Sequence, residues 1–108
     1  MKLSELIKSI DVLQVIGNSD VEVTDIQFDS RRVATGCLFV AQEGTAVDGH
    51  TYIEQCVENG AVAVVLEKEE YIKKNDVCYI LVKNSDEALG KIAHYWYGEP
   101  SKKLKLVG

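Results

Sequence analysis

Apolar residues recur along this chain with two different periods, one typical of helices and one typical of strands. Over residues 3–10 they recur every three or four positions, which predicts a short amphipathic helix. Between residues 21 and 28 they recur every second position, but the phase changes near Thr24-Asp25. We expect a bulge or two short strands there, because a one-residue slip turns every side chain to the other face.

Three uninterrupted apolar runs follow, at residues 37–41, 61–66 and 77–82. Runs of this length without alternation are typical of strands that are buried on both faces. Helical spacing predicts one helix over residues 52–57 and another over residues 85–96. Strands that alternate with helices favour right-handed crossovers. The predicted fold class is therefore α/β, with a small mixed or partly parallel sheet and flanking helices.

Polar residues mark where the two later helices begin. Asp48 or Thr51 can cap the first of them, and Thr51 with Glu54 three residues later matches a capping box. Asn84 or Ser85 is expected to cap the second helix.

The composition is that of an ordinary globular domain with a real core. The chain has 108 residues, of which 46% are hydrophobic, and a formal net charge of −5. Its negative charge argues against binding to nucleic acid or anionic lipid. No apolar run approaches the roughly 20 residues that span a bilayer, and the start lacks the features of a signal peptide, so a cytoplasmic protein is expected. The charged run at residues 67–70 predicts a solvated loop or an exposed turn.

The cysteines and histidines form no metal or disulfide pattern. Cys37, Cys56 and Cys78 are odd in number, far apart and surrounded by apolar residues, so buried thiols in a reducing compartment are expected. His50 and His94 have no Cys, Asp or second His at ligand spacing, which argues against a metal site.

Two polar loops flank the apolar run at residues 37–41. The first, residues 28–32, contains Ser30 and two arginines, and the second, residues 44–50, contains two glycines. Ligands of open α/β sheets usually bind among such loops, where arginine can pair with phosphate and glycine lets backbone amides approach. Taken alone, each feature is also typical of an ordinary turn or a solvated surface.

Residues for catalysis are not apparent. The pairs Asp29–Arg31 and Asp48–His50 could support acid–base chemistry, but no nucleophile accompanies them. The phosphate-binding pattern GxxxxGK[ST] occurs nowhere, and no GxGxxG follows a strand. We therefore expect no catalytic residue, cofactor site or metal ligand in this chain.

As a group, these loops and the strand between them resemble the N-terminal domain of the Mur ligases, the ATP-dependent amide ligases of bacterial peptidoglycan synthesis. The similarity covers nearly the whole chain after about residue 20. Within the family it looks like the ligase that adds the third residue of the stem peptide to UDP-N-acetylmuramoyl-L-alanyl-D-glutamate. The matching residues are Asp29-Ser30-Arg31-Arg32-Val33, Gly36, Leu38-Phe39-Val40-Ala41, Gly44, Asp48-Gly49 and Tyr52.

The resemblance implies that the domain binds the uridine-diphosphate part of this substrate. Ser30 would hydrogen-bond the nucleotide, and Phe28 would offer apolar surface or a backbone group to uracil. Thr45, Ala46 and Val47 would supply backbone contacts from the second loop.

The end of the sequence is expected to lead into another domain, because residues 104–107 begin a strand that has no partner. The resemblance implies that residues 1–100 form the UDP-substrate-binding domain. Residues 101–108 would be the linker and the start of a central domain, where ATP and Mg²⁺ act. The chain alone would not be catalytic. Its partners would be the UDP-N-acetylmuramoyl-dipeptide and the central and C-terminal domains of the parent chain.

Two alternatives remain open from the sequence. One is the sister ligase that adds D-alanyl-D-alanine, whose first domain has a similar Asp-(Ser/Thr)-Arg pattern, although the stretch Tyr-Gly-Glu-Pro-Ser at residues 97–101 favours the tripeptide ligase. The other is a free-standing α/β interaction module without a nucleotide ligand. The sequence also leaves open whether the third residue is meso-diaminopimelate or L-lysine.

Overall fold

The computed structural model describes residues 2–42, 48–73 and 77–97. Within these residues, one sheet has the strand order β1-β5-β4-β3-β2; β2 to β5 are parallel, and β1 is antiparallel to β5. Its strands are β1 (Val12–Ile16), β2 (Asp25–Gln27), β3 (Cys37–Val40), β4 (Ala63–Leu66) and β5 (Cys78–Val82). The α-helices are α1 (Leu3–Leu6), α2 (Ile53–Glu58) and α3 (Ser85–Tyr97). Short 3-10 turns are η1 (Ile7–Ser9), η2 (Ser30–Arg32), η3 (Gly49–Tyr52) and η4 (Glu69–Tyr71).

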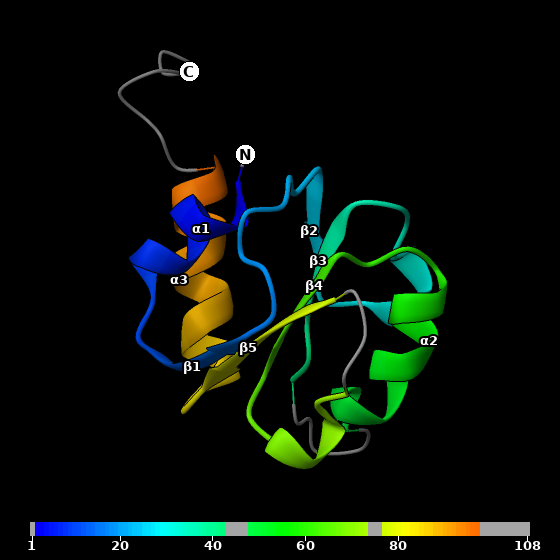
Figure 1. The fold of residues 1–108 in the computed structure, drawn as a ribbon. Helices are drawn as coiled ribbons and strands as arrows, with labels where there is room; N and C mark the ends of the chain where they lie inside the picture. The colour runs from blue at the N-terminus through cyan, green and yellow to red at the C-terminus, as the bar shows by residue number, and fades with distance from the viewer. Residues whose placement is uncertain (1, 43–47, 74–76, 98–108) are drawn as a thin grey trace.

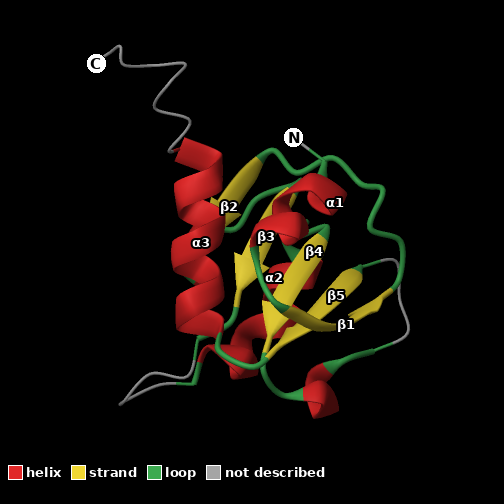
Figure 2. Cartoon of the chain, turned by 90° about the vertical axis from the view of Figure 1, so that its left-hand side faces the viewer, coloured by secondary structure: helices red, strands yellow, loops and turns green. Residues whose placement is uncertain are grey.

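The sheet lies between two helical layers, with α1 and α3 on one face and α2 on the other (Figures 1 and 2). Strand β3 shows how the sequence builds both layers. Leu38 and Val40 belong to the core cluster under α1 and α3, whereas Cys37 and Phe39 belong to the cluster under α2. Because both faces of the strand are covered, its four residues are all buried and all apolar. The predicted α/β fold with a partly parallel sheet is confirmed.

The three uninterrupted apolar runs form β3, β4 and β5, as predicted. Strand β1 was not predicted, because it lies at the edge of the sheet and its pattern does not alternate cleanly. Its residues Leu13 and Val15 are exposed. Two short pieces form between residues 21 and 28, as the phase change indicated: Glu22 makes an isolated bridge with Lys2, and β2 follows.

The helix caps are partly as predicted. Asn84 caps α3, since its side-chain oxygen accepts the backbone N–H of Glu87 at 3.0 Å. Asp48 caps the 3-10 turn η3, which precedes α2, by accepting the backbone N–H of His50 at 3.0 Å. The predicted capping box is wrong, because the Thr51 hydroxyl donates instead to the carbonyl of Asp48 at 2.8 Å.

The direction of the strands determines where polar loops gather. Since β2 to β5 are parallel, their carboxyl ends lie at one edge of the sheet, where ligands of open α/β folds bind. Turn η2 follows β2, turn η3 follows β3, and Glu67 and Lys68 follow β4. Three segments that are far apart in the sequence therefore meet at this edge.

The cysteines are buried free thiols, as predicted. Burial raises the pKa of the Cys56 thiol to about 11 and also raises the pKa of Cys78. Because the thiolate is the reactive form, we expect the native protein to resist a thiol reagent such as DTNB at neutral pH. All three thiols of Cys37, Cys56 and Cys78 should react once denaturant is added. Rapid labelling of any of them in the native protein would contradict this burial.

Candidate ligand-binding site at the carboxyl edge of the sheet

A cavity of about 570 Å³ opens at the carboxyl ends of β2 and β3. Its size is that of pockets for nucleotide-sized or drug-sized ligands, rather than single ions. The loop after β2, the end of β3 and the segment from η3 into α2 each form part of its wall. The lining residues are Phe28, Asp29, Ser30, Arg31, Phe39, Gln42, Gly49, Tyr52 and Gln55.

The loop after β2 is organised by Asp29. Its side chain accepts the backbone N–H of Arg31 at 3.0 Å and two hydrogen bonds from the Arg31 guanidinium, at 3.1 Å from Nε and 3.0 Å from Nη2. The Arg32 Nε lies 4.0 Å from the same carboxylate. Hydrogen bonds from Arg31 hold the pKa of Asp29 below its usual range. One carboxylate thus orders the turn that presents Ser30 to the cavity.

This loop keeps a net positive charge, because two guanidinium groups face one carboxylate. The side chains of Arg31 and Arg32 are 86% and 75% exposed. Exposed ion pairs contribute little to stability, whereas arginine binds phosphate strongly through paired hydrogen bonds. A phosphate group of a ligand can therefore displace or share these contacts at small cost.

The opposite wall of the cavity depends on Gly49. Its N–H donates to the carbonyl of Gln42 at 2.7 Å. A Cβ atom at Gly49 would lie 2.7 Å from that carbonyl oxygen and 2.9 Å from the Gln42 nitrogen, which is closer than carbon atoms pack. The sequence predicted a glycine that allows close approach, and the approach seen here is between the turn and the end of β3.

Behind this wall lies His50, whose side chain is fully buried. Its Nδ1 is 2.8 Å from the carboxylate of Asp48, and its Nε2 accepts the backbone N–H of Glu67 at 2.9 Å. An imidazole nitrogen that accepts an N–H carries no proton. The ring therefore holds its proton at Nδ1 and donates it to Asp48.

Asp48 also pairs with the ammonium group of Lys68. Burial alone would raise the pKa of Asp48, but the hydrogen bonds from Lys68 and His50 outweigh it and lower the pKa to about 2. Glu67 accepts the backbone N–H and the hydroxyl of Ser85, at 2.6 and 2.7 Å. The prediction of a solvated loop or an exposed turn over residues 67–70 is therefore wrong for Glu67 and Lys68, which are half-buried and bind specific partners.

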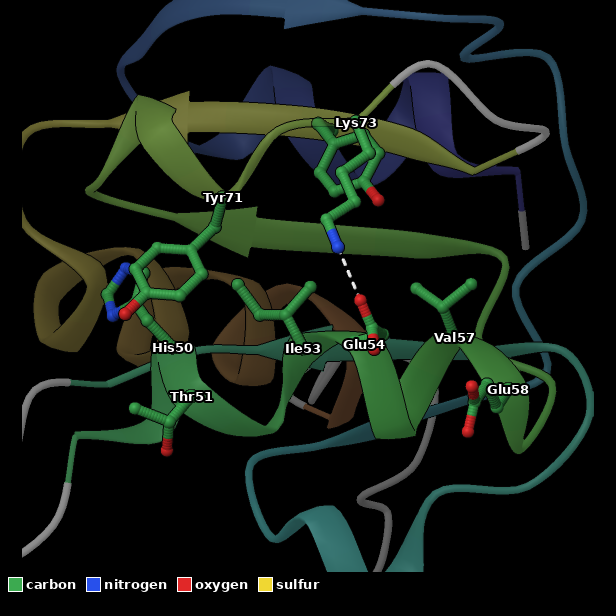
Figure 3. Close-up of a pocket in the computed structure, with 9 residues that line it drawn as sticks. His50, Thr51, Ile53, Glu54, Val57, Glu58, Tyr71 and Lys73 are labelled. Carbon is green, nitrogen blue, oxygen red and sulfur yellow. Dashed lines mark hydrogen bonds and ion pairs between the residues drawn. The ribbon is translucent and has the colours of Figure 1, made fainter.

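A smaller cavity of about 250 Å³ uses other residues of η3 and α2 (Figure 3). Tyr71 packs beside His50 there, with ring centroids 5.5 Å apart. Lys73 pairs with Glu54, as the dashed line in Figure 3 marks. These charged groups already satisfy each other, so the larger cavity offers the better site for a charged ligand.

The structure brings Phe28 and Ser30, both predicted site residues, to the larger cavity. The predicted contacts Thr45, Ala46 and Val47 lie outside the described residues. Tyr52 and Gln55 were not predicted as site residues, although their spacing of three on one helical face was a usable signal. Gln42 and Phe39 gave no such signal, because only the tertiary fold brings the end of β3 to the loop after β2.

The described residues bear on two other classes of site. Among them, no group of three His, Cys, Asp or Glu side chains is arranged to hold a metal ion. In the same part of the chain, no helix has the length and apolar character needed to cross a membrane.

Fold and cavity together define a small α/β domain with an aromatic and polar cavity at the sheet edge. A family model described as "Mur ligase family, catalytic domain" matches residues 22–97. The chain belongs to the Mur ligase family, as the resemblance of its loops predicted.

Curated relatives extend over the whole chain. It is 48% identical over 108 residues to a protein of Parabacteroides distasonis, and 46% identical over 109 residues to one of Cytophaga hutchinsonii. Both are named UDP-N-acetylmuramoyl-L-alanyl-D-glutamate–2,6-diaminopimelate ligase. The chain spans 22% of the length of each and corresponds to their N-terminal region.

Solved structures of Mur ligases share the fold. MurF from Acinetobacter baumannii matches 87% of this chain with a TM-score of 0.72 and 23% identity, over 20% of its own length. MurF ligase from Thermotoga maritima in complex with ADP matches 68% of this chain with a TM-score of 0.58 and 32% identity, over 17% of its length. The predicted Mur ligase N-terminal type of fold is confirmed.

The lowered pKa of Asp48 gives a pH-dependent contribution to stability. An aspartate whose pKa falls from 3.8 to about 2 on folding stabilises the protein above pH 4, and this contribution is lost as the pH falls from 4 to 2. The full contribution is about 2 kcal/mol. We expect Asp48→Asn to destabilise the protein at pH 7 and to unfold with a weaker dependence on pH in this window. Urea unfolding at pH 7 and at pH 3 measures both.

Asp11→Asn is the matched control, since the Asp11 side chain is 94% exposed. It should retain the pH dependence of the unsubstituted protein. The same pH dependence in Asp48→Asn as in this control would contradict the assignment.

Proposed function

We propose that this chain is the UDP-substrate-binding N-terminal domain of a ligase that adds diaminopimelate to UDP-N-acetylmuramoyl-L-alanyl-D-glutamate. The observation that carries the proposal is the shared cavity of Phe28 and Ser30, beside an arginine-bearing loop. The names of relatives up to 48% identical supply the substrate.

The lining residues suit the parts of a uridine diphosphate. Phe28 is 62% and Tyr52 is 37% exposed, so both offer aromatic surface on which a base can pack. Among the described residues, no hydrogen bond engages the side chain of Ser30, which leaves its hydroxyl available to the nucleotide. Arg31 and Arg32 supply positive charge for the diphosphate. The second loop, with Thr45, Ala46 and Val47, is proposed to add backbone contacts.

The residues of this chain do not fit ATP and Mg²⁺. No phosphate-binding GxxxxGK[ST] occurs in the sequence, and the described residues contain no metal-binding cluster. We therefore assign this chain no step of acyl-phosphate formation or amide bond formation. Its contribution is remote: binding the UDP part holds the distant carboxylate of the substrate in place for reaction. Residues 1–100 would form this binding domain, and residues 101–108 would lead into the domain that uses ATP.

The alternatives are less well supported. Similarity to MurF structures at 23% identity concerns the fold, whereas relatives at 44–48% identity are named diaminopimelate ligases. These names also favour diaminopimelate over L-lysine as the third residue. A free-standing interaction module would not account for an aromatic cavity beside a loop in which two arginines share one carboxylate.

An NMR titration of the chain with UDP and with UDP-N-acetylmuramoyl-L-alanyl-D-glutamate tests the proposal. We expect amide shifts centred on Phe28, Ser30 and Tyr52, with a Kd in the millimolar range for UDP, because most of the parent ligase is absent. Ser30→Ala should weaken binding about tenfold, the effect of one lost hydrogen bond. Uridine should bind more weakly than UDP, because it lacks the diphosphate.

Ser19→Ala is the matched control, because Ser19 is also half-buried but lies in a turn outside the cavity. The affinity of Ser19→Ala for UDP should stay within about twofold of the affinity of the unsubstituted chain. The absence of shifts around Ser30 at millimolar ligand would overturn the proposal and favour the interaction module.

A further inference from the structure

We propose that His50 is a positioning residue for the larger cavity: its buried imidazole fixes the wall formed by Gly49 and Tyr52. The ring itself does not line that cavity. The effect of His50 on UDP binding rests on the function proposed above, whereas the effect of His50 on the wall does not.

The imidazole of His50 has no access to solvent, so its nitrogens depend on partners within the protein. His50 is 0% exposed, and polar groups are rarely buried unless both donor and acceptor are satisfied. Here Asp48 accepts from Nδ1, and the Glu67 backbone donates to Nε2. The two bonds have opposite directions, so they admit one neutral tautomer and one ring orientation.

The oriented ring connects two segments of the chain. Asp48 and His50 belong to the segment after β3, whereas Glu67 follows β4 directly. The imidazole therefore ties the η3 turn to the carboxyl end of the neighbouring strand. Since Gly49 lies between Asp48 and His50, its contact with the backbone of Gln42 is held from both sides.

Neighbouring side chains hold the same arrangement. Lys68 pairs with Asp48. Figure 3 shows the ring of Tyr71 beside the imidazole. Glu67, whose N–H binds the ring, uses its carboxylate to hold Ser85 at the start of α3. The wall is thus tied to the sheet edge through the imidazole, and from there to the start of α3 through the Glu67 carboxylate.

Three experiments on the 108-residue chain test this inference. NMR of the ligand-free protein should show the His50 ring protonated at Nδ1, with Nε2 as an acceptor. A ring protonated at Nε2, or averaging between tautomers, would overturn the proposal without any substitution and without any ligand.

The second experiment is His50→Phe, which keeps an aromatic ring but removes both hydrogen bonds. We expect the Gly49 N–H to lose its protection from hydrogen exchange, and the affinity for UDP to fall about tenfold. The matched control is Ile92→Ala, which opens the core on the other face of the sheet. If Ile92→Ala loses as much thermal stability as His50→Phe, Gly49 should still be protected in it. Its Kd for UDP should stay within about twofold of the value for the unsubstituted chain.

The third experiment covers the case in which His50→Phe does not fold. Asp48→Asn retains an oxygen that accepts from Nδ1, whereas Asp48→Ala does not. Gly49 protection should persist in Asp48→Asn and disappear in Asp48→Ala. Equal protection in these two variants would overturn the inference. If the unsubstituted chain binds no UDP, the proposed function fails, but the tautomer and the Gly49 protection still decide the role of His50.

Discussion

Parallel pairing of β2, β3, β4 and β5 is the constraint on which the rest of the structure depends. It sends every carboxyl end to one edge, so segments that are far apart in the sequence come together there. Parallel strands also need crossovers on the faces of the sheet, and α2, which connects β3 to β4, covers one face. Helix α3, which follows β5, covers the other face (Figure 1). The cavity and the buried histidine are both consequences of this arrangement.

Much of the fold could be predicted because its central strands are buried on both sides. A residue such as Leu38 or Phe39 must be apolar whichever face it meets, so the run is visible in the sequence. Strand β1 was not predicted because it lies at the edge of the sheet and pairs only with β5. Its residues Leu13 and Val15 are apolar although they are exposed, so the strand shows no alternation of apolar and polar residues. The Thr51 capping box failed because a 3-10 turn capped by Asp48 begins before it.

Some residues of the candidate site could be predicted from the sequence, and others could not. Phe28 and Ser30 were predicted because they stand in a short contiguous motif that resembles a family pattern. The roles of His50 and Lys68 could not be predicted, because their partners Glu67 and Asp48 lie 17 and 20 residues away along the chain, after the neighbouring strand. A lone histidine and a charged run are usually unremarkable. Here the fold places them together, and the resulting hydrogen bonds satisfy a fully buried ring.

The central claim is that the larger cavity, beside Phe28 and Tyr52, receives the uracil and diphosphate of UDP. Intermolecular NOEs between the uracil protons H5 and H6 and the protein, in the chain saturated with UDP, test it most directly. We expect contacts from uracil to the rings of Phe28 and Tyr52. Contacts to Ile53 and Tyr71 instead would place the ligand in the smaller cavity and contradict the account.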